Sequence, residues 1–501
     1  MSADEDWDAV ADWLDRQAER TIETSCARVF LRPDVAWKIK RPVRLPFLDF
    51  STSGRRRWAL DRELTFNRRW ASDVYRAVRS VTRADGSFAL DGPGEAVEWL
   101  LEMRRFDADA VLANRPQAVD GKLAETLGRL IARAHIDAPV TPDGGGAAAL
   151  GYTIATNKTS LRRAPKLEAA AVRRLIDRTR IGRDALGPLL ESRRRAGFGR
   201  HCHGDLHLGN ILLEDGLAVP FDCIEFNDQL SRIDVLYDVA FPIMDLVVRD
   251  HTEAANRLLN AYLDEAARGM PATLWDGLAA LPVFLSVRAA VRAHVTAAMG
   301  EDGLARRYLA AAEGFLEPPK ARLFAIGGLS GTGKSTFARA LAPLVPDAPG
   351  AVILRSDEIR KRVWGVGHLD PLPNAAYAPD QDVQVYDEMF RLAASVFRAG
   401  HSVVLDATFL APQDRLGAED LAASLGASIS PVWLEGDREF LRARLAARTF
   451  DSSDATLEVL DRQLASDRGL VTWPRVSATA EFGATARRQA TAVDADRPGS
   501  S

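Results

Sequence analysis

Apolar and polar positions divide the first part of the chain into a mixed segment and a helical segment. Residues 27–31 and 35–40 are rich in apolar side chains and are joined by a short Arg-Pro-Asp connection, which predicts a β-hairpin. The spacing of apolar residues predicts further elements in order: a helix at 60–70, a strand at 96–104, a helix at 123–134, a Gly/Ala loop at 144–149 and helices throughout 253–316. Strands first and helices later predict an α+β fold with a small mixed lobe followed by a mostly helical lobe.

A different pattern begins after the paired prolines Pro318 and Pro319. Proline cannot continue a helix, so this pair predicts a domain boundary. Beyond it, helices alternate with apolar runs that we expect to be strands, at 323–327, 351–355, 402–405 and 429–434. That alternation is typical of an α/β domain with a parallel sheet. Two later helices, 441–448 and 457–465, enclose a polar loop at 449–454 that resembles a lid.

The chain of 501 residues is long enough for two or three domains. We predict one domain over residues 1–317, a second over 318–490, and a flexible tail over 491–501, which is rich in small and polar residues.

Composition and charge narrow the classes of protein that fit. A hydrophobic fraction of 47% and a charged fraction of 27% are those of a globular protein, and a net charge of −4 gives no electrostatic case for nucleic acid or an anionic membrane. Three cysteines, an acidic N-terminus and the lack of an apolar run near 18 residues predict a cytoplasmic protein without a membrane partner. Its oligomeric state stays open.

The first candidate site is the motif H-G-D-x-H-x-x-N at residues 203–210, followed by Asp222. Kinase-type transfer needs a carboxylate that accepts the proton of the acceptor hydroxyl, and an amide oxygen and a second carboxylate that hold Mg²⁺ against the phosphates of ATP. Asp205 has the position of the catalytic base, and Asn210 and Asp222 have the positions of the metal ligands. We expect Asp234 and Asp238 to brace this loop.

The same chemistry needs a lysine on an early strand and a glutamate from the next helix. Lys38 and Glu63 are the candidates for this nucleotide-binding pair. Lys40 is the rival of Lys38, because side chains on one face of a strand repeat every two residues. Arg288 and Arg292 lie one helical turn apart, where they could grip an anionic acceptor; a solvated helix face is the expectation we favour.

Residues 203–210 together with Asp222 resemble the aminoglycoside phosphotransferase branch of the protein-kinase-like superfamily. The resemblance spans about residues 20–310 and implies a two-lobed fold, with ATP between the lobes and the acceptor on the helical lobe. One feature departs from kinases with a glycine-rich loop: residues 23–27, where the loop over the nucleotide should lie, contain no glycine.

The second candidate site matches G-x-x-x-x-G-K-S in full, between an apolar strand and a helix. In such a P-loop, backbone N–H groups and the helix N-terminus hold the phosphates, the lysine reaches the β and γ oxygens, and the serine hydroxyl binds Mg²⁺. We expect ATP to contact Gly328, Ser330, Gly331, Thr332, Gly333, Lys334, Ser335 and Thr336.

Partners for this P-loop follow along the chain. Asp357 ends the second strand, where a small-molecule kinase keeps its base, and Arg360 lies one turn further on. Asp406 ends an apolar strand and is expected to bind Mg²⁺ with Ser335. Either Arg444 or Arg448, spaced by four on a lid helix, is expected to neutralise charge on the transferring phosphoryl group, and we favour Arg448.

Residues 323–467 resemble the gluconate kinase, zeta-toxin and polynucleotide-kinase group of P-loop kinases. The whole chain resembles the bifunctional aminoglycoside phosphotransferase and ATP-binding proteins. The sequence therefore predicts an enzyme with two Mg-ATP sites, each of which phosphorylates a hydroxyl of a small molecule such as an aminoglycoside, amino sugar or sugar acid. Two alternatives stay open: the first domain is a regulatory pseudokinase, or the P-loop domain is a hydrolysing ATPase.

Overall fold

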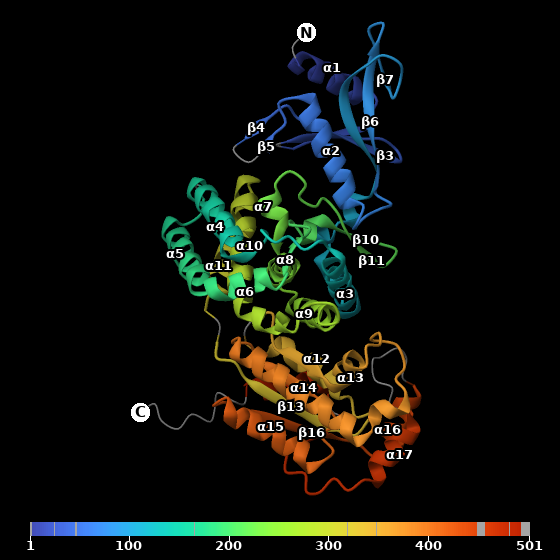
Figure 1. Cartoon of the computed structure of the whole chain (residues 1–501), viewed down its shortest axis with the longest axis vertical. Coiled ribbons are helices and arrows are strands. Elements are labelled where there is room, and N and C mark those ends of the chain that lie inside the picture. Colours follow the sequence, from blue (N-terminus) through green and yellow to red (C-terminus); the bar gives the residue numbers. More distant parts are fainter. Residues whose placement is uncertain are drawn as a thin grey trace.

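The computed structural model describes residues 3–24, 26–45, 48–164, 166–317, 319–346, 348–447, 456–479 and 481–491. The molecule is elongated, and three layers follow one another along its long axis in the order of the sequence (Figure 1). A sheet with two helices forms the first layer, a bundle of helices forms the second, and a sheet flanked by helices forms the third.

The first layer is built on a six-stranded antiparallel sheet of order β1-β2-β3-β8-β6-β7. Its elements, with the small hairpin β4-β5, are α1 (Ala3–Asp15), β1 (Arg20–Glu23), β2 (Ala27–Leu31), β3 (Val35–Lys40), β4 (Arg44–Leu45), β5 (Leu48–Asp49), α2 (Ser53–Asn67), β6 (Tyr75–Ala84), β7 (Ser87–Leu90) and β8 (Glu95–Arg104). The predicted hairpin is confirmed as β2-β3. Helix α2 begins earlier than predicted, because Thr52 caps it and accepts a hydrogen bond from the Arg55 N–H.

Both faces of this sheet are covered by helices. Trp37 and Ile39 of β3 pack in one apolar cluster with Trp7 and Val10 of α1. The opposite face of β3 turns toward α2, where Lys38 and Lys40 reach Glu63. Burial on both faces explains why β3 has no simple apolar and polar alternation.

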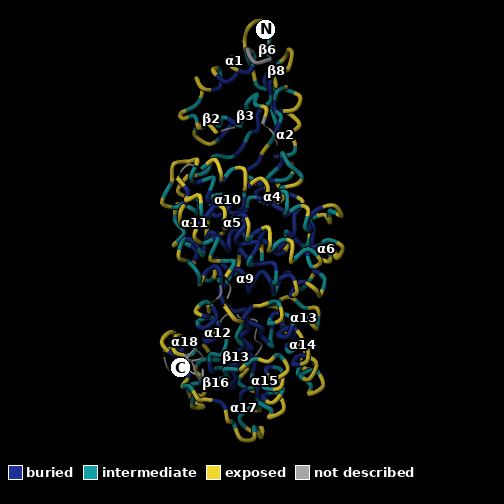
Figure 2. The backbone as a smooth tube through the Cα atoms, turned by 90° about the vertical axis from the view of Figure 1, so that its left-hand side faces the viewer, coloured by how far each residue is buried: buried dark blue, intermediate teal, exposed yellow. Residues whose placement is uncertain are grey.

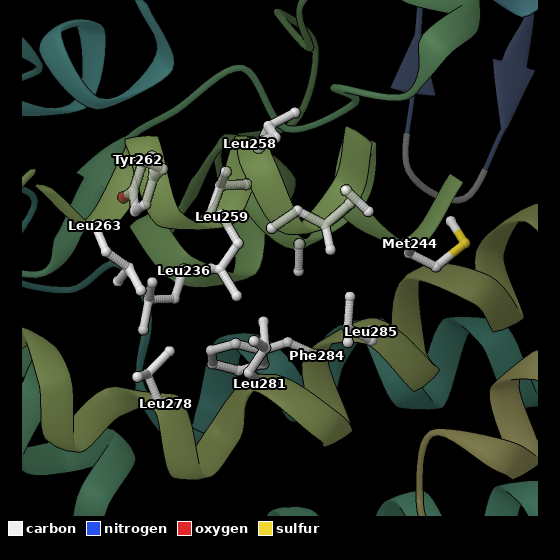
Figure 3. Close-up of a cluster of buried hydrophobic side chains, with 14 of the residues drawn as sticks. Leu236, Met244, Leu258, Leu259, Tyr262, Leu263, Leu278, Leu281, Phe284 and Leu285 are labelled. Carbon is white, nitrogen blue, oxygen red and sulfur yellow. The ribbon is translucent and has the colours of Figure 1, made fainter. Parts of the chain in front are cut away.

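The second layer is helical, apart from the hairpin β10-β11 and the strand pair β9-β12. Its elements are α3 (Gly121–Asp137), α4 (Gly146–Arg163), α5 (Ala169–Ala185), α6 (Gly187–Arg195), β9 (Gly199–His201), β10 (Ile211–Glu214), β11 (Leu217–Pro220), α7 (Asp228–Ser231), β12 (Arg232–Asp234), α8 (Val235–Val248), α9 (Thr252–Ala266), η5 (Ala272–Ala280), α10 (Leu281–Ala298) and α11 (Asp302–Gly314). Side chains from α8, α9, η5 and α10 form its centre (Figure 3). The predicted loop at 144–149 is wrong, since α4 already begins at Gly146 and its alanines continue the helix.

The third layer is a five-stranded parallel sheet of order β14-β15-β13-β16-β17, as the alternation of strands and helices predicted. Its elements are β13 (Leu323–Gly328), α12 (Lys334–Leu341), β14 (Val352–Arg355), α13 (Ser356–Val363), α14 (Pro379–Arg398), β15 (Val403–Asp406), α15 (Pro412–Ser424), β16 (Ile429–Glu435), α16 (Arg438–Ala446), α17 (Leu457–Ala465), β17 (Arg475–Ser477) and α18 (Phe482–Thr491). Strand β17 and helix α18 were not predicted. The loop at 449–454 and most of the predicted tail lie outside the described residues.

The apolar core is continuous from the second layer into the third. One cluster of buried side chains includes Leu259 and Leu263 of α9 and continues to Val352 and Leu354 of β14. Buried positions accordingly lie on both sides of the junction between the second and third layers (Figure 2). The segment Ala272–Ala298 is long and apolar enough to span a membrane, but 78% of its most apolar window is buried in this core.

We expect a protease to cut near Lys320, which is exposed between the two patterns of secondary structure. Because the core is continuous, the two fragments should stay associated and elute together from a gel-filtration column under native conditions. Fragments that separate without denaturant would contradict a shared core and would support two independently folded domains.

Candidate active sites

Two lysines and two glutamates form a buried charge cluster between the sheet of the first layer and α2. The Lys38 ammonium lies 2.7 Å from Glu63 Oε1 and 3.1 Å from Asp222 Oδ1. The Lys40 ammonium lies 2.6 Å from Glu63 Oε2 and 2.5 Å from Glu225 Oε1. Lys38 therefore contacts its predicted partner Glu63 and also the predicted metal ligand Asp222, whereas Lys40 joins Glu63 to a carboxylate that sequence reasoning missed.

The cluster controls the ionisation of its carboxylates. Burial alone would raise the pKa of Glu63, but Lys38 and Lys40 lower it to about 2. Burial raises the pKa of Glu225 above its usual value, although Lys40 opposes this shift. Lys40 is 2% exposed and Lys38 15%, so only Lys38 keeps part of its side chain accessible.

The hairpin β10-β11 brings the residues of the H-G-D-x-H-x-x-N motif to Asp222. Asn210 precedes β10, Asp222 follows β11 at a positive φ of 58°, and Ile211 pairs with Pro220 across the hairpin. Asn210 Nδ2 donates to the Asp205 carboxylate at 3.0 Å, which leaves the amide oxygen for a metal ion. The structure thus places the predicted base and the two predicted metal ligands together.

His207 and Arg292 keep Asp205 ionised. Burial would raise the pKa of Asp205, but the attraction of His207 Nε2, 3.5 Å from Oδ2, and of Arg292 holds it well below its usual range. The Gly209 N–H donates to His207 Nδ1 at 2.9 Å, and Arg292 Nη1 lies 3.2 Å from His207 Nε2, so the ring is held at both nitrogens beside the carboxylate.

Buried side chains fix the backbone of this loop. Asp238 accepts hydrogen bonds from the N–H groups of His203 and Gly204, as expected for a brace. Asp234 acts more remotely, through two hydrogen bonds from Arg193. The expectation of a solvated Arg288 is wrong, because this side chain is 4% exposed and donates to the Gly204 carbonyl at 2.8 Å.

Three glycines give the second motif the shape of a phosphate-binding loop. Gly328, Gly331 and Gly333 have φ values of 141°, 87° and 90°, which side chains rarely adopt. A Cβ at Gly331 would lie 3.0 Å from the Leu441 carbonyl, so α16 closely covers the loop. The Ser330 N–H donates to Gln463 Oε1 of α17 at 2.8 Å, a contact that a bound phosphate would have to replace.

The carboxyl ends of β14, β15 and β13 lie side by side at this loop. Arg355 and Ile326 are both in register with Asp406, which places the end of each neighbouring strand beside this carboxylate. Asp406 is 4% exposed, and its Oδ2 has no hydrogen-bond partner among the described residues, although Arg355 Nε lies 3.4 Å away. A buried carboxylate oxygen without a donor suits a divalent cation.

A cavity of about 830 Å³ opens at these strand ends. Of the predicted residues, its wall contains Ser330, Gly331, Gly333, Lys334, Ser335, Thr336, Asp357, Arg360, Asp406 and Arg444. Gly328 and Thr332 are buried outside this wall, and Arg448 lies outside the described residues. Residues that sequence reasoning missed in this wall are Tyr377, Asp382, Tyr386, Thr408, Asp414, Arg462 and Gln463.

Charged residues of both signs line the cavity. Lys334, Arg444 and Arg462 come from the P-loop helix and the lid helices α16 and α17. Carboxylates come from three other helices: Asp357 of α13, Asp382 of α14 and Asp414 of α15. Arg360 of α13 is already bound, since it donates to Asp382 at 2.6 Å and to the Ala376 carbonyl at 2.7 Å.

Family comparisons match both parts of the chain. The phosphotransferase enzyme family matches residues 61–280, and a family described as an AAA domain matches residues 323–469. These matches confirm the predicted order of a protein-kinase-like domain followed by a P-loop kinase domain with a parallel sheet.

The relatives match most of the chain, and the solved structures match smaller parts of it. Uncharacterized proteins of Mycobacterium tuberculosis and Mycobacterium bovis are 32% identical over 459 residues, which cover 87% of this chain and 88% of theirs. A gluconokinase from Sinorhizobium meliloti is 24% identical over 34% of this chain and 90% of its own, with a TM-score of 0.25. An amicoumacin kinase in complex with AMP-PNP, Ca²⁺ and its ligand is 14% identical over 62% of this chain and 94% of its own, with a TM-score of 0.38.

The two lysines of the charge cluster should respond differently to replacement. Lys40→Ala leaves Glu63 and Glu225 buried with one cation fewer, so it should lower the free energy of unfolding by about 3–5 kcal/mol. Lys38→Ala leaves Glu63 paired with Lys40, so it should cost less than half as much but reduce ADP release by about 100-fold. Urea denaturation and ADP release, both measured in a Lys334→Ala background, check this. The reverse order of effects would assign phosphate binding to Lys40.

Proposed function

The chain belongs to the same family as these mycobacterial proteins, and because it joins two phosphotransferase domains, we propose that it carries two separate Mg-ATP sites. It is a phosphotransferase enzyme, and each site would transfer the γ-phosphoryl group to a hydroxyl of a small molecule. The observation that carries this proposal is that each half of the chain brings together carboxylates and a lysine of its own, which could serve as base, metal ligands and phosphate-binding group.

At the first site, Asp205 would accept the proton of the acceptor hydroxyl as the phosphoryl group leaves ATP. The low pKa of Asp205 keeps it ionised and ready for this role. Lys38 would hold the phosphates, and Glu63 fixes the position of its ammonium. Mg²⁺, held by Asn210 and Asp222, would supply charge neutralisation between the phosphates.

At the second site, Asp357 would be the base and Lys334 would bind the β and γ oxygens. Ser335 and Asp406 would hold the metal ion, and the buried oxygen of Asp406 that accepts no hydrogen bond among the described residues supports this assignment. Arg444 lines the cavity and would neutralise charge on the transferring phosphoryl group, and Arg448, the other predicted lid arginine, lies outside the described residues.

The charge of the wall favours a neutral or amine-bearing acceptor at the second site. Three carboxylates from α13, α14 and α15 line the cavity, and the arginine of α13 in this wall is bound by Asp382. A sugar acid would bring a further negative charge against them, whereas an amino sugar would bring a compensating one. The ATPase alternative is less well supported, because a cavity of this size leaves room for an acceptor beside the nucleotide.

A regulatory role of the first domain is the second candidate. It is favoured by one observation, the apolar core that the two domains share. Energetic coupling between the nucleotide sites would then be about 1–3 kcal/mol.

Substitution of one residue at each site tests the independence of the two reactions. Asp205→Asn should stop transfer at the first site while ATP still binds there, because base and metal ligands are different groups. Lys334→Ala should reduce turnover at the second site by orders of magnitude and change the first by less than about twofold. A screen of hydroxyl compounds with both variants of the full chain, followed by ADP release, measures each site alone. ATP is also titrated into Lys334→Ala, Asp222→Ala and the double variant. Changes in binding free energy that differ from additivity by more than about 1 kcal/mol would support regulation instead.

Acceptor preference at the second site should depend on pH through Asp414. Burial and the charge of Asp382 raise its pKa to about 6, so it is ionised at pH 7.5 and becomes neutral as the pH falls through 6. In an Asp205→Asn background, the KM for glucosamine should therefore rise between pH 7.5 and 5.5, and gluconate should be the poorer substrate at pH 7.5. Asp414→Asn should remove the pH dependence. A preference for gluconate at pH 7.5 would contradict a cationic acceptor.

A further inference from the structure

Strand β14 lies at one edge of the parallel sheet, and helix α9 of the preceding domain covers this edge. An edge strand presents N–H and C=O groups that no neighbouring strand satisfies. Here Asn260 Oδ1 accepts from the Ile353 N–H at 2.7 Å, and Asn256 Nδ2 donates to the Ala351 carbonyl at 3.0 Å. The two asparagine side chains of α9 thus make hydrogen bonds that a neighbouring strand would otherwise make. All four hydrogen-bonding groups belong to buried residues.

The helix that follows β14 is held by charges from the same domain. Glu358 of α13 is 2% exposed and lies 3.1 Å from Arg268 and 3.4 Å from Arg129 of α3. Burial and the neighbouring Glu358 raise the pKa of Asp264 of α9, at the same junction, to about 7. Removal of the arginines would leave Glu358 buried without a cation.

The junction is adjacent in sequence to the second active site. Strand β14 ends at Arg355, and α13 then presents Asp357 to the cavity and Glu358 to the preceding domain. Successive residues of a helix point about 100° apart, so fixing Glu358 also fixes the direction of Asp357.

We propose that the kinase-like domain is a structural part of the second active site, in which Asn256, Asn260, Arg129 and Arg268 position β14 and α13. These four are positioning residues, and they act on the reaction through Asp357. The proposal rests on the proposed function only for the role of Asp357 as the base.

The opposite side of α9 supports the first active site. Tyr262 bonds to His135 Nδ1 at 3.0 Å, and His135 Nε2 lies 3.1 Å from Asp238. Asp238 in turn holds the N–H groups of His203 and Gly204. A single helix therefore braces the catalytic loop of one domain and the edge strand of the other.

Hydrogen exchange and ADP release of the full chain test the proposal, in an Asp205→Asn background with glucosamine as the acceptor and a varied concentration of Mg-ATP. Asn260→Ala, and Arg129→Ala combined with Arg268→Ala, should speed amide exchange in residues 352–363 at least tenfold. They should lower kcat at least tenfold and leave the KM for ATP within twofold, since the P-loop itself is untouched. Arg268→Lys, which keeps the charge, should recover more than half of the rate lost in Arg268→Ala.

Arg133→Ala is the matched control, because Arg133 lies one turn along α3 from Arg129 and its ion pair in the described structure is with Glu265. It should change neither readout, and exchange in α2 should be equal in all variants. Exchange and kcat equal to those of Arg133→Ala would overturn the proposal, as would faster exchange with an unchanged kcat. If the Asp205→Asn parent releases no ADP with glucosamine, the amine-bearing acceptor proposed for the second site is wrong, and the exchange comparison alone decides whether α9 holds β14.

Discussion

Helix α9 is buried on two sides, against the helical lobe and against the parallel sheet, and the rest of the structure depends on this double contact. One side packs its leucines into the core of the helical lobe, and another carries the asparagines that complete the edge of the parallel sheet. A polar side chain in such a place stabilises the protein only when its hydrogen bonds are satisfied, and an unsatisfied one costs about 1–3 kcal/mol. The position of α9 is therefore fixed from both sides at once.

The two active sites achieve preorganisation by different physical means. At the first, opposite charges are brought together in the protein interior, so that Glu63 keeps two ammonium groups in place and stays ionised. At the second, the backbone provides the phosphate site, because positive φ values at three glycines give the loop its shape. Charge clusters depend on residues distant in sequence, whereas a P-loop is specified within eight residues.

This difference explains what could be predicted from the sequence. The P-loop, the parallel sheet and the β2-β3 hairpin follow from local patterns. The β10-β11 hairpin explains how Asn210 and Asp222, which are separated along the sequence, come close together. The pairing of Lys40 with Glu225 joins residues 185 positions apart, and no local signal marks it. From its spacing on a helix, Arg288 is expected to lie on a solvated face. Only the packing of α10 against α8 shows that it donates a hydrogen bond to the Gly204 carbonyl.

The paired prolines show the limit of reading domains from local pattern. They lie between a helical pattern and a pattern of alternating strands and helices, and the sequence therefore predicts a boundary there. Whether two domains are separate depends on the side chains at the junction, and here Leu259 of α9 shares a core with Leu354 of β14. Asn260 is an ordinary helical asparagine in the sequence, yet it replaces a strand in the sheet of the next domain. A change of pattern in the sequence is thus not a gap in the packing, and the support that we propose for the second site comes from residues ninety or more positions before Glu358.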